Sequence, residues 1–214
     1  MRVAINIINA AKILGETKIQ ELEEKRIVPK MMLRRRLTRN AKIMLYIADK
    51  CEFKGGKIVY ASAFGELQAT VGITDAILEE TPISPTLFQN SVYNSAPSYF
   101  SLLNADKDEI FTLSNGDKSS LDAIKTATLQ ALVSQERVLC VASECLDIKN
   151  IDEVNSCTKY LESGAGAVIE IAQDEEGAVE LESLCQEGVI PSMRELMSLV
   201  SMQESGKTKV YIEL

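Results

Sequence analysis

The chain alternates between short apolar runs and longer segments whose apolar residues recur every three or four positions. The short runs are rich in β-branched residues and are bounded by glycine or polar turns, which is typical of strands. The run at residues 138–142 is apolar throughout, so it fits a strand buried on both faces. The pattern predicts strands at residues 1–7, 57–62, 110–113, 138–142 and 167–171.

The longer segments predict helices between and after these strands. Thr38 fits the N-cap of the first helix, because its hydroxyl can accept a hydrogen bond from a free N–H of the first turn. The later segments repeat apolar side chains with a period of about 3.6 residues. Helical patterns occupy residues 38–47, 66–79, 119–133, 179–185 and 193–202, and residues 209–212 fit an edge strand.

Strands that alternate with helices predict an α/β fold with a mostly parallel sheet and helices on both of its faces. No helical pattern separates the fourth strand from the fifth, so an antiparallel return is expected there. We therefore predict a five-stranded mixed sheet. The chain is expected to form a single domain, residues 1–214, with a core at residues 1–172 and a C-terminal helical extension at 173–214.

The amino-acid composition indicates the class of protein and its cellular compartment. Apolar residues make up 46% and charged residues 25%, as in ordinary soluble globular proteins. The apolar runs are far shorter than the ~20 residues that span a bilayer. The N-terminus lacks the apolar region of a signal peptide, and the five cysteines form no CxxC pair, so a cytoplasmic protein is expected. Cys140, inside a strand pattern, fits a small buried apolar residue.

Charge is distributed unevenly. The net charge of −8 argues against a nucleic-acid binder. Residues 25–42 nevertheless contain no acid, and their cations are Lys25, Arg26, Lys30, Arg34, Arg35, Arg36, Arg39 and Lys42. This basic segment predicts contact with an acidic partner or a phosphate through Arg34, Arg35, Arg36 and Arg39. The alternative is local salt bridges, with Glu21, Glu23 and Glu24 as the nearest acids.

Candidate chemistry gathers at residues 110–123, which predict a short strand, a glycine turn and the start of a helix. Ser119 and Asp122 have the spacing of a capping box, although aspartate replaces the usual glutamate. The chain contains no histidine, so mixed zinc sites are excluded, and the cysteine spacing fits no four-cysteine site. We expect neither a metal nor a cofactor.

Four segments resemble a known family: residues 32–39 (MLRRRLTR), 61–67 (ASAFGEL), 84–95 (SPTLFQNSVYNS) and 162–170 (ESGAGAVIE). They are similar to "LRRRLSR", "ASRHGEL", "SPTAFSLSVHNA" and the small-residue start of a ketosynthase strand. Together they resemble the short, stand-alone β-ketoacyl synthase-like N-terminal domain family over residues 1–172. The resemblance implies the N-terminal half of a thiolase fold.

The departures from this family concern its reactive positions. Tyr93 and Phe64 stand where the family's segments carry histidines. The alignment places Asp117 at the position of the reactive cysteine, and aspartate is a poor thioester nucleophile. The resemblance therefore implies a ketosynthase scaffold without condensing chemistry, and an enzyme is not expected.

Three classes of function remain open. The first is a non-catalytic binding or assembly subunit of fatty-acid or polyketide-type synthesis, paired with itself or with a ketosynthase and in contact with an acyl carrier protein. The second is a divergent acyl transferase or hydrolase with a site near Ser91, Tyr93 and Asp117. The third is a structural protein that kept the fold and lost the ligand. Ser91, Tyr93 and Asn94 are candidates for an acyl pocket, although a loop held by its own hydrogen bonds also explains them.

Overall fold

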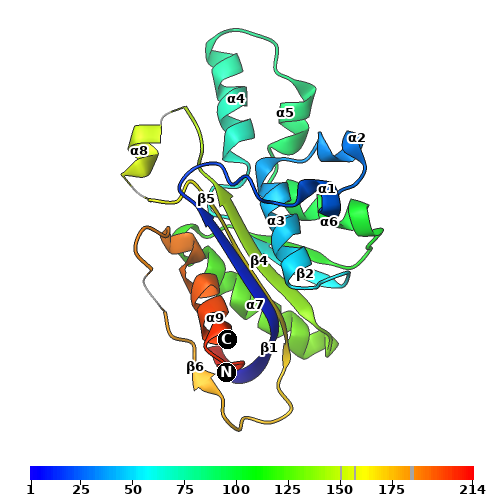
Figure 1. Cartoon of the computed structure of the whole chain (residues 1–214), viewed down its shortest axis with the longest axis vertical. Coiled ribbons are helices and arrows are strands. Elements are labelled where there is room, and N and C mark those ends of the chain that lie inside the picture. Colours follow the sequence, from blue (N-terminus) through cyan, green and yellow to red (C-terminus); the bar gives the residue numbers. More distant parts are fainter. Residues whose placement is uncertain (150, 157, 184–185) are drawn as a thin grey trace.

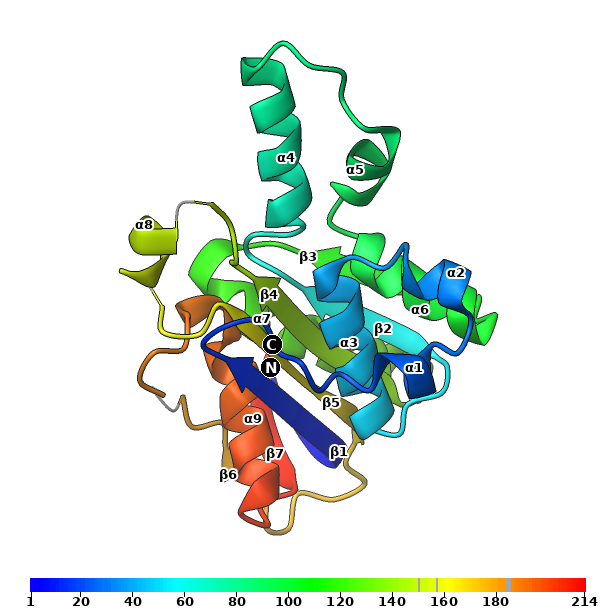
Figure 2. The ribbon, with the colours of Figure 1, turned by 45° about the horizontal axis from the view of Figure 1, so that its top comes forward.

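One mixed sheet organises the part of the chain that the computed structural model describes, residues 1–149, 151–156, 158–183 and 186–214. Within these residues, seven strands are ordered β3-β2-β4-β5-β1-β7-β6 (Figures 1 and 2). The strands are β1 Arg2–Gly15, β2 Lys57–Ala61, β3 Ile110–Leu113, β4 Val138–Cys145, β5 Glu162–Ile171, β6 Val179–Glu180 and β7 Lys209–Glu213. The helices are α1 Glu24–Ile27, α2 Met31–Arg34, α3 Arg39–Lys50, α4 Leu67–Leu78, α5 Pro85–Asn90, α6 Ser95–Asn104, α7 Ser119–Ser134, α8 Ile151–Asn155 and α9 Arg194–Glu204, with 3-10 turns η1 Gly116–Lys118 and η2 Pro191–Met193.

Strand directions confirm the mixed sheet. β2 runs parallel to β3 and β4, whereas β5 runs antiparallel to β4, as the missing crossover helix predicted. β1 is antiparallel to both β5 and β7. The prediction of five strands is wrong, because β7 and β6 continue the sheet beyond β1.

The C-terminal segment differs most from expectation. Residues 209–213 form an interior strand between β1 and β6, and not the edge strand that was predicted. Val179 and Glu180, predicted to start a helix, pair in parallel with Val210 and Tyr211 instead. The helix predicted at 193–202 is present as α9. Of the five cysteines, Cys157 and Cys185 lie outside the described residues, and Cys140 is buried as predicted.

Helices cover both faces of the sheet (Figure 2). Side chains alternate between the faces along each strand, so Val59 and Ala61 point toward α7 and α9, whereas Ile58 and Tyr60 point toward α3 and α6. The two apolar layers that result contain most of the buried side chains of the described residues.

Helix α3 packs closely on β5 because glycines leave room for it. A Cβ atom on Gly164 would lie 2.4 Å from Ile43 Cγ2, and one on Gly166 would lie 2.8 Å from Ile47 Cγ2. The helix begins as predicted, with the Thr38 hydroxyl accepting the Ala41 N–H at 3.0 Å. The small residues at 163–166 thus set the packing distance between helix and sheet.

Helices α4 and α5 project away from the sheet in both views (Figures 1 and 2). The helix predicted at 66–79 is present, but Ala69 is its only buried residue. The exposed apolar side chains of this projection are Ile77, Leu78, Ile83, Phe88 and Val92. We call these five residues the α4–α5 surface.

Candidate functional site at the carboxyl ends of the parallel strands

The parallel strands β2, β3 and β4 bring their carboxyl ends to one edge of the sheet. Ligands of open α/β sheets bind outside this edge. Three parts of the chain meet there: residues 62–66 after β2, residues 114–118 after β3, and Glu144 near the end of β4. This edge is therefore the place to look for chemistry.

Asp117 lies in the turn η1 between β3 and α7, so the predicted strand, turn and helix are present. Its side chain is exposed. Ser119 stabilises the turn, since its hydroxyl accepts the Asn115 N–H at 3.0 Å and donates to the Gly116 carbonyl at 2.7 Å. The predicted capping box does not form, because Lys118 is the N-cap residue and the Asp122 carboxylate accepts a hydrogen bond from the Asn115 amide at 2.5 Å.

Tyr93 joins this edge from the segment between α5 and α6. Its hydroxyl donates to the Ala63 carbonyl at 3.3 Å, and the Ser114 hydroxyl donates to the same carbonyl at 3.4 Å. The Tyr93 ring lies only 3.0 Å from where a Cβ atom on Gly65 would be, and Gly65 has a φ of +57°. Tyr93 and Phe64, the two positions where the family's segments carry histidines, are therefore neighbours.

The other two residues of the predicted pocket have local roles. The Ser91 hydroxyl donates to the Phe88 carbonyl at 2.9 Å, at the end of α5. Asn94 is exposed and is the N-cap residue of α6. Neither has a hydrogen bond to Tyr93 or Asp117 among the described residues. Of the predicted pocket residues Ser91, Tyr93 and Asn94, only Tyr93 has a hydrogen bond to the loop at this edge of the sheet.

Glu144 is the buried centre of this edge, and sequence reasoning missed it. Its carboxylate accepts hydrogen bonds from the Ser62 hydroxyl at 2.8 Å, from the Ala63 N–H, from the Phe64 N–H at 3.3 Å and from the Ser192 hydroxyl at 3.2 Å. Burial raises the pKa of Glu144 to about 7, and these donors oppose the rise. The carboxylate fixes the loop after β2 against β4 and η2.

This buried carboxyl predicts a pH-dependent contribution to stability. The folded pKa of about 7 exceeds the ordinary value of 4.5, so between these pH values the folded state holds a proton that the unfolded state has lost. The contribution of Glu144 to the free energy of unfolding is therefore fully present below about pH 4.5 and is lost as the pH rises through about 7. The whole change amounts to up to about 3 kcal/mol. Urea unfolding of the wild type and of Glu144→Gln across this range should show the wild type losing stability relative to the variant.

The exposed Glu176 provides the control for this measurement. Glu176→Gln should leave the pH dependence of the free energy of unfolding as it is in the wild type. If the wild type and Glu144→Gln differ by a constant amount at every pH, Glu144 does not titrate in this range.

The chemistry available at this edge is limited. The Ser62 hydroxyl is hydrogen-bonded to a carboxylate, but Ser62 and Glu144 are both buried, so a substrate cannot reach the pair. The Ser114 hydroxyl donates to the Ala63 backbone carbonyl, and among the described residues no side chain that could act as a general base hydrogen-bonds to it. Across the described residues, no group of three histidine, cysteine, aspartate or glutamate side chains is placed to hold a metal ion.

The basic segment separates into buried and exposed arginines. Arg39 is internal: its guanidinium binds the Glu162 carboxylate, with Nε–Oε1 at 2.6 Å and Nη2–Oε2 at 2.7 Å. Arg34 donates to the Val28 carbonyl at 2.8 Å. Arg35 and Arg36 are exposed, and in the part of the chain that the structure describes neither has an acid within 4.0 Å. A partner can therefore reach Arg35 and Arg36 but not Arg39.

The alternative of local salt bridges holds for other members of the segment. Glu23 pairs with Arg26 and Lys50, and Glu24 pairs with Arg39 and Lys42. Glu23 and Glu24 therefore form their ion pairs with cations other than Arg34, Arg35 and Arg36.

No helix among the described residues is both long and apolar enough to cross a membrane.

The family described as beta-ketoacyl synthase, N-terminal domain, matches residues 14–177. No curated protein matches the chain.

Solved structures share the fold. The chain is similar to one in the complex of a ketosynthase (ApeO) with its chain length factor (ApeC) from Xenorhabdus doucetiae, at 20% identity and a TM-score of 0.65, covering 79% of this chain and 80% of that one. It is also similar to a structure of a type II polyketide synthase acyl-carrier protein with its ketosynthase, at 17% identity and a TM-score of 0.61, covering 81% of this chain. A third similar structure is the ishigamide ketosynthase/chain length factor, at 12% identity and a TM-score of 0.60, also covering 81% of this chain. It spans 64% and 63% of the chains in these last two structures.

Proposed function

We propose that this chain, which belongs to the β-ketoacyl synthase N-terminal domain family, is a non-catalytic subunit that pairs with a ketosynthase in fatty-acid or polyketide-type synthesis. The family match confirms the resemblance seen in the four sequence segments. The fold is that of ketosynthases, whereas Asp117 occupies the place where the resemblance puts the reactive cysteine.

The α4–α5 surface is the observation that carries the proposal. Leu78, at the end of α4, and Phe88, in α5, are 77% and 68% exposed on a projection that the rest of the described chain does not cover. Several exposed apolar side chains on one projection indicate a protein interface, because leaving them in water is unfavourable. A subunit that functions only when paired would have such a surface.

The comparisons support a ketosynthase as the partner. One similar structure is a ketosynthase in complex with its chain length factor, and the shares of the two chains that are covered, 79% and 80%, are nearly equal. The matched chain in that complex is therefore about as long as this one. The absence of histidine and the aspartate at residue 117 fit a subunit that leaves the condensing chemistry to its partner.

The pairing predicts a selective effect of charge on the α4–α5 surface. Leu78→Asp with Phe88→Asp should abolish co-elution with a ketosynthase from the same genome, because burying two carboxylates in an apolar interface is costly. Val133→Asp is the matched control: Val133 is 74% exposed on α7, away from this surface, and the variant should still pair. Size-exclusion chromatography with light scattering gives the readout.

Other outcomes are equally informative. A wild-type chain that forms only a homodimer, lost in the double variant, would replace the ketosynthase with a second copy of this chain. Pairing that survives the double variant would remove the α4–α5 surface from the proposal. Transfer or hydrolysis of the acyl group of an acyl-carrier thioester by this chain alone, lost in Asp117→Ala, would favour the divergent acyl transferase or hydrolase instead.

We further propose that Arg35 and Arg36 contact an acidic acyl carrier protein. Both are exposed without a nearby acid. Charges of this kind raise the association rate of a complex more than they raise its affinity. Arg35→Ala with Arg36→Ala should slow association several-fold at low salt and little at high salt, since exposed charges are screened over about 8–10 Å. Stopped-flow titration at two salt concentrations measures this, and Lys18→Ala with Lys107→Ala removes the same charge elsewhere. Equal rates for both double variants would contradict the contact.

A further inference from the structure

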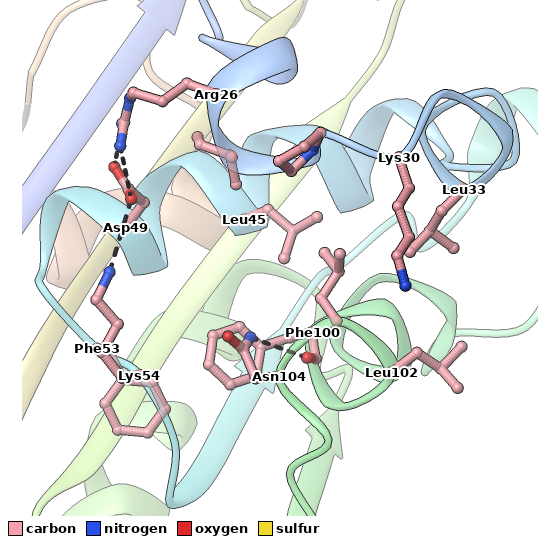
Figure 3. A pocket seen from close by; sticks show the side chains of 13 residues that line it. Arg26, Lys30, Leu33, Leu45, Asp49, Phe53, Lys54, Phe100, Leu102 and Asn104 are labelled. Atoms are coloured by element: carbon pink, nitrogen blue, oxygen red, sulfur yellow. Dashed lines mark hydrogen bonds and ion pairs between the residues drawn. The ribbon is translucent and has the colours of Figure 1, made fainter.

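A cavity of about 460 Å³ lies between α1, α2, α3 and α6 (Figure 3). Its volume is within the range of about 300–1,000 Å³ that small-molecule sites occupy. Its lining shares no residue with the edge that holds Glu144, Tyr93 and Asp117. It is therefore a separate feature of the fold.

The floor of the cavity is apolar. Leu45, Phe53 and Phe100 are buried there, and the two phenylalanine rings lie 5.5 Å apart at an angle of 33°. Ile27 and Leu33 extend the apolar wall. A ligand with an apolar body would gain free energy here, at roughly 25 cal/mol for each Å² of apolar surface removed from water.

The rim of the cavity carries an excess of positive charge. Its lining includes the cations Arg26, Lys30 and Lys54 but a single acid, Asp49. Asp49 is already paired with Arg26 and lies 3.8 Å from Lys54. Lys30 has no acid within 4.0 Å among the described residues, and its side chain reaches over the cavity beside Leu33 (Figure 3). The free cation thus lies above an apolar floor.

We propose that this cavity binds a small apolar molecule with one anionic head group, a carboxylate or a phosphate. The apolar body packs on Phe53 and Phe100, and the head group accepts a charge-assisted hydrogen bond from the Lys30 ammonium. Asp49 does not repel the head group strongly, because Arg26 neutralises it. The inference does not depend on pairing with a ketosynthase.

Calorimetric titration of the full chain tests this with four probes of equal chain length: decanoate, decyl phosphate, decanol and decyltrimethylammonium, each kept below the concentration at which it forms micelles. We expect one site for at least one of the two anions, with decanol and the cation binding at least tenfold more weakly. The stronger anion identifies the head group. Lys30→Gln should weaken its binding about tenfold, as the loss of a hydrogen bond to a charged group does.

Two variants test the position of the site. Leu33→Trp fills the cavity and should abolish binding, and Leu102→Trp, at the exposed rim, blocks it without disturbing the buried floor. Lys107→Gln, an exposed cation outside the lining, should bind like the wild type. The proposal is overturned if neither anion binds, if decanol binds as tightly as the anions, if Lys30→Gln has no effect, or if binding persists in both tryptophan variants.

Discussion

Deleting residues 178–214 is expected to abolish cooperative folding. The deletion removes β6, α9 and β7, and with them the helix that packs on β1, β5 and α7. Full burial of one large apolar side chain stabilises a protein by about 1.5–3 kcal/mol. The buried apolar side chains of the segment include Leu196, Met197, Leu199, Val200, Met202, Val210 and Ile212. Their combined contribution, about 10 kcal/mol or more, is comparable to the whole stability of an ordinary domain.

Circular dichroism during heating measures this result: the full chain should show one cooperative transition and the shortened chain none. Leu199→Ala is a milder test in the full chain and should cost about 2–5 kcal/mol, because Leu199 is fully buried. Gln203→Ala, on the same helix but less buried, should cost far less. A shortened chain with a cooperative transition near that of the full chain would show that β1 to β5 are stable without the segment.

Replacing Arg39 with methionine is expected to lower the free energy of unfolding by about 3–5 kcal/mol. The side chains of Arg39 and Glu162 are 8% and 1% exposed, and they are joined by two parallel hydrogen bonds. Glu162 also accepts the Ile19 N–H at 2.7 Å. Without the guanidinium, this carboxylate would remain buried with no cation beside it.

Arg35→Met is the matched control, since Arg35 lies in the same basic segment but is exposed, and its effect should stay within about 0.5 kcal/mol. Combining Arg39→Met with Glu162→Gln should recover most of the lost stability, because the double variant contains no buried unpaired charge. Urea unfolding of the four proteins measures these differences. Equal losses for Arg39→Met and Arg35→Met would contradict a structural role for the buried pair.

Local patterns predicted most of the fold. The helices at 38–47, 66–79 and 119–133 follow from 3.6-residue periodicity, and β2, β3 and β4 follow from short apolar runs. The pairing of strands that are distant in sequence could not be predicted from local patterns. β6 is two residues long, too short for any periodicity, and its partner β7 lies far along the chain. The interior place of β7 depends on β1, which no local pattern encodes.

The candidate site shows the same limit. The turn that holds Asp117 could be placed from its flanking strand and helix, but the roles of individual side chains depended on partners distant in sequence. Arg39 and Arg35 look alike in the sequence, and they differ only because Glu162, 123 residues away, lies against Arg39. Glu144 likewise stands out only after folding brings Ser62 and Ser192 to it.

The interior position of β1 in the sheet also has a consequence for synthesis on the ribosome. β1 is translated well before its two neighbours in the sheet, which begin at residues 162 and 209. At about 5–20 residues per second, β1 waits many seconds with both edges unpaired. Unpaired strand edges with apolar side chains such as Ile5 and Ile7 are prone to wrong association. The nascent chain is therefore expected to need a chaperone until β7 has emerged, so its yield in cells should depend on chaperone supply more than on the stability of the folded state.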